Sequence, residues 1–386
     1  MIIDMKTVKG VKLNGQTVKY IHDLNNNQLW PYNGPGPQPL NYFYFEGIEN
    51  GTEIGVTTTY DVPGQITARF WISNDKTNWS EWGYNSFPVQ TINSREKLYI
   101  WNKENTMSNV KFTTSKNVKC GGNIMSLLNW REDLYDYCFR GLFMGTKITT
   151  APALPAITLA QNCYFQMFTN CTSLNIAPAL PATTLATGCY AYMFVGCTNL
   201  TAAPVLPATT LAYGCYAGMF RGCTSLTTAP VLPATTLAER CYYNMFNNCY
   251  ALITAPELPA NTLINSCYYE MFKGCTSLTT APALLATVLA DSCCYGMFSD
   301  CTSLTTAPAL MATTLVTNCY RDMFYNCTNL NYVKAMFTTD ISSTTNYTLT
   351  WLSGVAANGT FVKNINATWI RRDSSGIPSG WTVQTN

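Results

Sequence analysis

Apolar and polar residues recur in a fixed order over residues 163–327, with a period of 26 residues. The recurring phrase reads Cys-Tyr-x-x-Met-Phe-x-x-Cys-Thr-x-Leu, followed by Ala-Pro-x-Leu. Its first cysteine falls at Cys163, Cys189, Cys215, Cys241, Cys267, Cys293 and Cys319. A period of this size is typical of a solenoid, in which each repeat packs only on its neighbours.

Within one repeat the pattern predicts a short helix followed by a short strand. On a helical wheel at 100° per residue, the constant positions share one arc and the variable positions lie opposite. The constant positions of the first full repeat are Cys163, Tyr164, Met167, Phe168 and Cys171. The strand predicted next ends at Pro178, which has no N–H to donate. Strands stack about 4.8 Å apart and helices about 8–10 Å, so we predict a curved, right-handed α+β solenoid.

Four further segments surround this solenoid, which we expect over residues 120–344 with its caps. Residues 1–32 alternate around Asn14-Gly15, which predicts a β-hairpin module for attachment. Residues 33–39 are a Pro/Gly linker. Residues 40–119 predict a small, Ig-like β-sandwich, with strands near 42–48, 53–59, 66–73, 80–87, 97–101 and 109–113. Residues 345–386 predict a C-terminal β cap, with strands near 348–355, 359–363, 367–371 and 381–384.

The composition narrows the classes of function. Charged residues make up 11% of the chain, against roughly 25% in ordinary domains. The net charge is +2 without a long basic run, so we expect no nucleic-acid partner. Apolar runs end well short of about 18 residues, so we expect no membrane insertion, and the N-terminus shows no secretory signal. With one histidine and no phosphate-loop or hydrolase motif, we expect no catalytic residue, cofactor or metal site.

Cysteine is the most unusual residue of the repeats. Fourteen of the 17 cysteines stand in two columns, eight residues apart within each phrase. We interpret them as buried free thiols that pack as small hydrophobes, with disulfides as the alternative. The spacing does not fit a zinc site. In the sandwich, Trp71, Trp79, Trp82 and Trp101 are expected in the core, with a sugar-stacking platform as the alternative.

Two surfaces of the solenoid are candidates for binding. The first is the hydroxyl-rich strand face, at Ser173, Asn175, Asn199, Thr201, Ser225, Thr227, Ser277, Thr279, Ser303 and Thr305. The second is the outer face of the predicted helices, where residues vary most between repeats: Tyr192, Arg221, Tyr243, Tyr269, Glu270 and Arg321.

The phrase from Met219 to Ala238, Met-Phe-Arg-Gly-Cys-Thr-Ser-Leu-Thr-Thr-Ala-Pro-Val-Leu-Pro-Ala-Thr-Thr-Leu-Ala, resembles the BspA-type leucine-rich repeat. The resemblance covers about residues 120–335 and implies a leucine-rich-repeat solenoid of bacterial surface proteins and of phages of gut bacteria. It implies adhesion or host recognition without a shared catalytic centre. Residues 359–385 resemble the closing segment of such proteins, and residues 11–30 are similar to attachment segments of phage tail and fibre proteins.

Together these features predict a non-enzymatic structural protein of a phage virion, a fibre or spike of the head or tail. Residues 1–39 would bind other virion proteins, and the solenoid would bind a glycan or protein on the host surface. A homotrimer would suit a fibre, although no heptad run supports one. The alternative is a BspA-like adhesin on the bacterial cell surface, or secreted, that binds host protein or glycan.

Overall fold

The computed structural model describes residues 41–58, 66, 68–83, 86–104, 106–107, 109–131, 133–342 and 346–386, and the backbone of four short strands before them. These strands are β1 (Lys12–Leu13), β2 (Gln16–Thr17), β3 (Ile21–His22) and β4 (Gln28–Trp30). β1 pairs antiparallel with β2 on either side of Asn14-Gly15, and β3 pairs with β4. The other residues of the predicted attachment module and linker lie outside the described residues.

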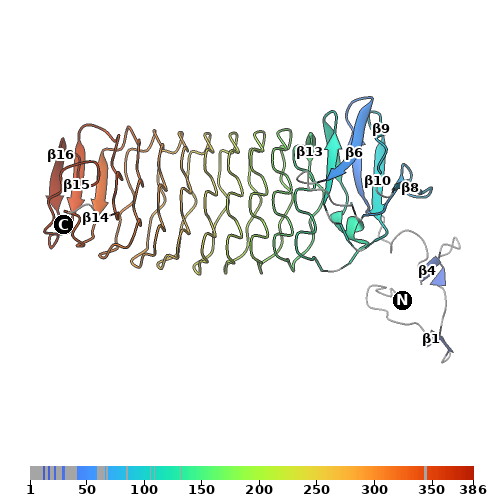
Figure 1. Ribbon diagram of the computed structural model, residues 1–386, viewed down its shortest axis with the longest axis horizontal. Coiled ribbons are helices and arrows are strands. Elements are labelled where there is room, and N and C mark those ends of the chain that lie inside the picture. The colour runs from blue at the N-terminus through green and yellow to red at the C-terminus, as the bar shows by residue number, and fades with distance from the viewer. Residues whose placement is uncertain are drawn as a thin grey trace.

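Two sheets form the N-terminal part of the described chain (Figure 1). Each β-rich run predicted between residues 42 and 113 overlaps a strand. The strands are β5 (Phe43–Gly47), β6 (Thr52–Thr58), β7 (Phe70–Ser73), β8 (Ser80–Gly83), β9 (Gln90–Ile92), β10 (Lys97–Asn102), β11 (Val110–Thr114) and β12 (Val118–Gly121). A six-stranded sheet has the order β13-β12-β5-β10-β7-β8, where β13 is Ile148–Thr150, and a three-stranded sheet has the order β11-β6-β9.

The two sheets pack face to face and continue into the repeats. Phe43 and Phe45 of β5 lie 5.7 and 5.3 Å from Phe112 of β11, measured between ring centroids. Phe112 in turn stacks on Phe143 of the first coil at 5.7 Å. β12 pairs in parallel with β13, and one hydrophobic cluster runs from Phe43 to Trp381. The sandwich therefore covers the first end of the solenoid core.

The segment predicted as a helix in each repeat is a run of β-turns, which we call the turn leg. In the first full repeat the N–H of Phe165 donates to the carbonyl of Asn162 at 3.1 Å, a contact between residues three apart. The next N–H, that of Gln166, donates to the carbonyl of Ala191 in the following coil at 3.0 Å. This alternation continues along the leg. The predicted helix is wrong, and among the described residues the helices are limited to one 3₁₀ helix, η1 (Ile124–Leu128).

Backbone dihedrals explain why no helix forms. Every fourth residue of the leg has a positive φ: 51° at Asn162, 55° at Gln166 and 58° at Asn170. A right-handed helix has no place for such residues. The chain thus repeats every four residues, or 90° per residue, and over so short a segment this burial pattern is nearly the same as that of a helix.

Equivalent side chains stack in columns through the solenoid. The rings of Phe168, Phe194, Phe220, Phe246, Phe272, Phe298 and Phe324 form one column with centroids 5.5–5.7 Å apart and planes within 10° of each other. A second buried column begins with Tyr164 and Tyr190, 5.7 Å apart.

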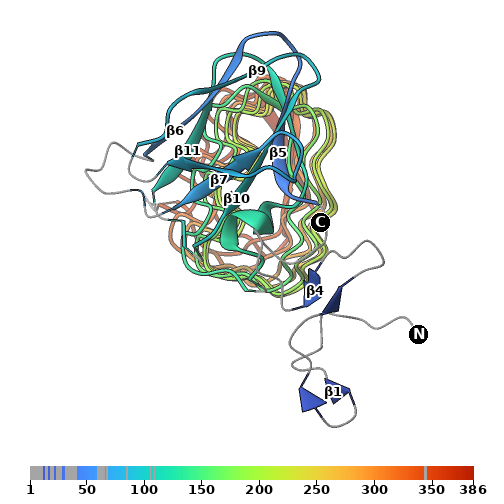
Figure 2. The ribbon, with the colours of Figure 1, turned by 90° about the vertical axis from the view of Figure 1, so that its right-hand side faces the viewer.

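The solenoid is nearly straight, and the predicted curvature is absent (Figures 1 and 2). The prediction depended on helices, which need about 8–10 Å between neighbours, on one side of the stack. Consecutive turn legs are joined by direct backbone hydrogen bonds, as paired strands are, so the two sides of a coil differ little in thickness. The opposite leg is extended, and the strand predicted there is reduced to single β-bridges such as Thr228–Thr254.

All 17 cysteines are buried and free, which confirms their interpretation as packing residues. In the second column each thiol also donates a hydrogen bond to the preceding coil. The Cys197 Sγ lies 3.1 Å from the carbonyl oxygen of Phe168, and the Cys223 Sγ lies 3.1 Å from that of Phe194. These bonds join consecutive coils inside the core.

The C-terminal end closes the stack with a three-stranded parallel sheet: β14 (Tyr332–Ala335), β15 (Gly359–Lys363) and β16 (Trp381–Thr385). Residues 347–353 form a further turn leg, because Tyr320 and Phe324 donate to the carbonyls of Tyr347 and Trp351. The strand predicted over 348–355 is therefore wrong, and the one predicted over 367–371 is also wrong, since those residues form no strand.

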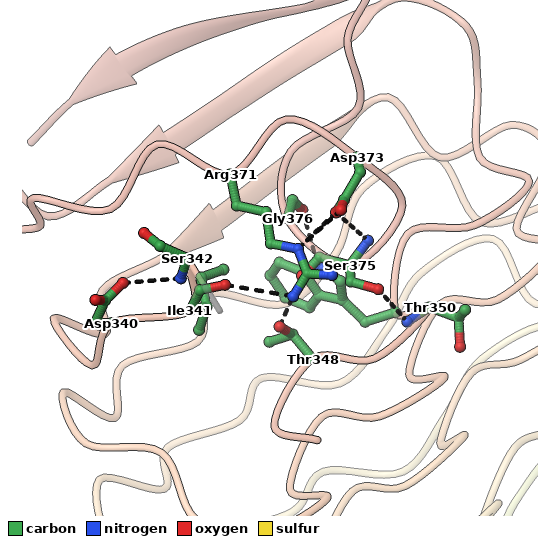
Figure 3. Close-up of polar contacts among 10 residues, drawn as sticks. Asp340, Ile341, Ser342, Thr348, Thr350, Arg371, Asp373, Ser375 and Gly376 are labelled. Atoms are coloured by element: carbon green, nitrogen blue, oxygen red, sulfur yellow. Dashed lines mark hydrogen bonds and ion pairs between the residues drawn. The ribbon is translucent and has the colours of Figure 1, made fainter. Parts of the chain in front are cut away.

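A loop that contains Ser374 and Ser375 caps this last leg (Figure 3). The N–H of Thr350 donates to the Ser375 Oγ at 2.9 Å, and the N–H of Leu352 donates to the Ser374 carbonyl at 3.1 Å. Arg371 donates to the carbonyl of Ile341 at 3.3 Å, which holds the loop against the stack.

Candidate functional site

Three half-buried tyrosines stack on the outer side of the turn legs, and we call them the tyrosine ladder: Tyr243, Tyr269 and Tyr295. Ring centroids are 4.7 Å apart between Tyr243 and Tyr269 and 4.6 Å apart between Tyr269 and Tyr295, with planes 13° and 8° from parallel. Each tyrosine precedes a positive-φ residue in the middle of its leg. The same stacking that builds the core thus also builds a regular aromatic surface.

Each end of the ladder carries an arginine. The Arg240 guanidinium lies 5.9 Å from the ring centroid of Tyr243, and that of Arg321 lies 5.6 Å from the centroid of Tyr295. Arg321 pairs with Asp322 at 3.5 Å, and Arg240 pairs with its neighbour Glu239 at 3.8 Å. The charges at both ends are therefore largely neutralised.

Tyrosine phenols are protonated at neutral pH, and the surroundings of the ladder raise their pKa further. Burial raises the pKa of Tyr269, and the negative charge of Glu270 raises it further. Burial and a hydrogen bond to Asp322 raise the pKa of Tyr295. Glu270 itself pairs with Lys273 at 2.9 Å. The ladder therefore presents neutral hydroxyl groups, which both donate and accept hydrogen bonds.

The coil of the first rung and the coil before it each hold one polar group without a partner in the described chain. Asn244 is 8% exposed, and its Oδ1 has no hydrogen-bond partner among the described residues. Arg221 is exposed and has no ion-pair partner within the described part of the chain. Burial raises the pKa of the nearby Tyr243, and the charge of Arg221 offsets part of that rise. Tyr192 lies so close over Gly218 that a Cβ there would be 2.4 Å from its ring. Because Ala217 stands in the ladder column of that coil, no ring continues the stack there.

The structure brings together most of the second candidate set. Tyr243 and Tyr269 form the ladder, Glu270 and Arg321 contact it, and Tyr192 and Arg221 lie at its N-terminal end. The face consists of turns rather than helices. Tyr295, Arg240 and Asn244 were missed, although the recurrence of tyrosine at 243, 269 and 295 is a signal in the sequence.

The first candidate set lies on the extended legs and does not form a polar cluster. Its members are exposed or half-buried: Ser173, Asn175, Asn199, Thr201, Ser225, Thr227, Ser277, Thr279, Ser303 and Thr305. Ser173 donates to the Asn117 Oδ1 at 2.8 Å, and the N–H of Thr227 donates to the Thr201 carbonyl at 3.4 Å.

The four tryptophans of the sandwich divide between two environments. Trp82 lies in the core, 3% exposed, while Trp101 is buried outside the main cluster. Trp71 and Trp79 are half-buried beside Trp101, with ring centroids 6.3 and 6.4 Å from it.

Metal and membrane features are absent from the described residues. None of their His, Cys, Asp and Glu side chains gather in threes that could hold a metal ion. In the same residues, no helix is long and apolar enough to cross a membrane. Comparison of the chain with family models, curated proteins and solved structures finds no match.

Proposed function

We propose that this chain is a non-enzymatic structural protein of a phage virion, of fibre or spike type, that recognises the host surface through its solenoid. The observation that supports this proposal is the separation of constant interior columns from variable exterior ones. Met193, Phe194 and Cys197 are fully buried and recur in other coils. The exterior column that holds Tyr243 contains Ala191 in one coil and Arg321 in another.

This separation suits recognition, because the exterior can change without affecting the core. In repeat proteins each unit contacts only its neighbours, and the extended surface is used for binding. The relationship to BspA-type leucine-rich repeats belongs to the same proposal. It is based on the shared phrase, with the turn leg in place of the expected helix. The sandwich of residues 40–119 would act as a spacer and cap.

The buried thiols favour a virion protein over an exported adhesin. Phage structural proteins fold in the bacterial cytoplasm, where thiols stay reduced. The thiols of Cys197 and Cys223 act as hydrogen-bond donors inside the core, so the fold requires their reduced form. An adhesin would fold after export, where disulfides form more readily.

A cell-binding assay with the full chain tests the proposal. We expect the fluorescently labelled protein to bind a subset of gut bacteria, and binding to fall when surface polysaccharide or protein is removed. If no strain of a broad panel binds it, host recognition is wrong. Removal of residues 1–39 should prevent incorporation into phage particles. Particles that contain the truncated protein would contradict the attachment role.

A further inference from the structure

We infer that the tyrosine ladder and the coil before it form a binding site for a neutral polysaccharide that runs along the solenoid. The site comprises Tyr243, Tyr269 and Tyr295, with Asn244 and Arg221 at the N-terminal end. The inference depends on the proposed function only for the source of the ligand, the host surface.

The spacing of the ladder favours a polysaccharide over a peptide. Its rungs are 4.6–4.7 Å apart. An extended peptide places side chains of one face about 6.8 Å apart, since each residue advances about 3.4 Å. A peptide would therefore lose register with the ladder after two rungs. An extended polysaccharide has a shorter repeat than this peptide spacing, so its sugars follow the rungs more closely than alternate side chains do.

The unpaired groups match the hydroxyl chemistry of a sugar. The Asn244 Oδ1 is a buried acceptor without a donor among the described residues, and such an atom is costly to leave unsatisfied. A sugar hydroxyl can donate to this oxygen and accept from Arg221. The Tyr243 hydroxyl can do either, since a tyrosine phenol keeps its proton at neutral pH and burial raises the pKa of Tyr243 further. One hydroxyl-rich ring at this position would satisfy all three.

The aromatic stack ends at the first rung, where an arginine takes the place of a further ring. Tyr269 has a tyrosine on both faces, but Tyr243 has one ring neighbour among the described residues. On its other side Ala217 occupies the column, and the nearby Arg240 lies 5.9 Å from the ring centroid. A sugar at this end would therefore meet the edge of Tyr243 and the Arg240 guanidinium.

The charges of this surface favour a neutral ligand. Glu239 pairs with Arg240, Glu270 with Lys273 and Asp322 with Arg321. Burial and acidic neighbours raise the pKa of Tyr269 and Tyr295, so the far end of the ladder offers an anion no excess positive charge. Within this site, a polyanion such as an acidic capsule would find an unpaired positive charge at Arg221 alone.

Binding of full-length variants to defined polysaccharides tests the inference. The probes are mannan, laminarin and pullulan, which are neutral, and polygalacturonate, which is acidic. Tyr243→Ala removes the first rung, and Asn244→Gly removes the acceptor while tolerating its φ of 54°. The matched control is Tyr325→Ala, which removes a tyrosine that is 44% exposed on another column.

We expect a neutral polysaccharide to bind, with about tenfold weaker affinity for Tyr243→Ala and Asn244→Gly and unchanged affinity for Tyr325→Ala. Thermal unfolding of the variants should match that of the parent. Binding should change little between about 50 and 500 mM salt. The inference is wrong if Tyr243→Ala binds like the parent, or if polygalacturonate alone binds and salt abolishes it.

The same variants separate this inference from the proposed function. If cells bind the protein through the ladder but protease treatment of the cells removes binding, the partner is a protein and the inference fails while host recognition stands. If a neutral polysaccharide binds through the ladder but no cell does, the inference stands and the proposed function fails.

Discussion

The sandwich packs aromatic rings at varied angles, from 15° between Trp82 and Phe112 to 85° between Trp82 and Phe87, whereas the solenoid packs them at nearly constant angles. In the sandwich, Phe45 meets Phe43 at 77° and Phe112 at 79°, so these rings cross edge to face. In the solenoid, Phe220 meets Phe194 and Phe246 at 4° and 7°. Each ring of the sandwich has its own unlike neighbours, whereas each ring of the solenoid meets copies of itself. The environment of one residue type, such as a buried thiol or ring, therefore recurs in every coil of the solenoid but occurs once in the sandwich.

Alkaline pH should produce the largest difference between the two regions. Burial raises the pKa of six solenoid thiols from 9.0 to about 12: Cys163, Cys171, Cys215, Cys249, Cys319 and Cys327. The unfolded chain loses these protons from about pH 9 and the folded chain near pH 12. Stability is therefore complete below pH 9 and falls between pH 9 and 12, by about 1.4 kcal/mol per pH unit for each thiol.

Circular dichroism and thiolate absorbance, recorded together against pH, check this prediction. We expect thiolate to appear in the same transition in which the solenoid unfolds. The sandwich holds Cys120 alone among residues 41–121 and should be less sensitive. Titration of most thiols near pH 9 in a folded protein would contradict buried columns.

Truncation of one rung should have the next largest effect. Phe220→Ala leaves a cavity between Phe194 and Phe246 and should lower the free energy of unfolding by about 3–5 kcal/mol. Urea denaturation measures the loss. The milder pair Phe220→Leu and Phe246→Leu should be non-additive by about 0.5–3 kcal/mol, because the two rings touch. Phe220→Leu with Phe324→Leu, which are not in contact, should add. If the losses in free energy of unfolding add in both pairs, neighbouring rings of the column do not depend on each other for their stability.

Substitution of a positive-φ glycine should have a smaller effect that depends on the neighbouring coil. Gly222 and Gly274 have φ of 72° and 73°. A Cβ at Gly222 would meet no atom closer than 3.6 Å, but at Gly274 it would lie 2.3 Å from the Asn248 Oδ1. Gly222→Ala should cost roughly 1–2 kcal/mol for backbone strain alone, and Gly274→Ala more. The double variant Gly274→Ala with Asn248→Gly lacks the clashing side chain. Its melting temperature, relative to Asn248→Gly alone, should fall only as far as that of Gly222→Ala falls relative to the parent. A larger fall would exclude the clash as the cause.

The sequence predicted burial better than backbone conformation. The helical wheel correctly separated Met167 and Phe168 from the outer positions, because periods of 3.6 and 4.0 residues hardly diverge over nine residues. It could not show that the leg consists of turns. The residue before the second cysteine contained that information, since it is Asn, Gly or Asp in each full repeat, the residues that best tolerate positive φ.

The candidate site was predicted in part for the same reason. The residue type at the position of Tyr243, Tyr269 and Arg321 varies between repeats, which indicated that this position lies on the exterior. It did not show that the tyrosine rings stack. The importance of Asn244 could not be predicted, because its isolation depends on the packing of neighbouring coils. The capping of residues 347–353 by Ser374 and Ser375 was also hidden, since serines in a loop carry no distinctive pattern.

The caps have a consequence for the length of the molecule. The sandwich ends the stack at one side, where the N–H of Phe112 donates to the carbonyl of Leu142, and the serine loop ends it at the other. Neither cap contacts the middle coils, so whole 26-residue units can be gained or lost by recombination between the nearly identical repeats. Each unit would change the reach of the protein by about 4.8 Å without altering either end. Length is thus a quantity that selection can adjust in small, uniform steps.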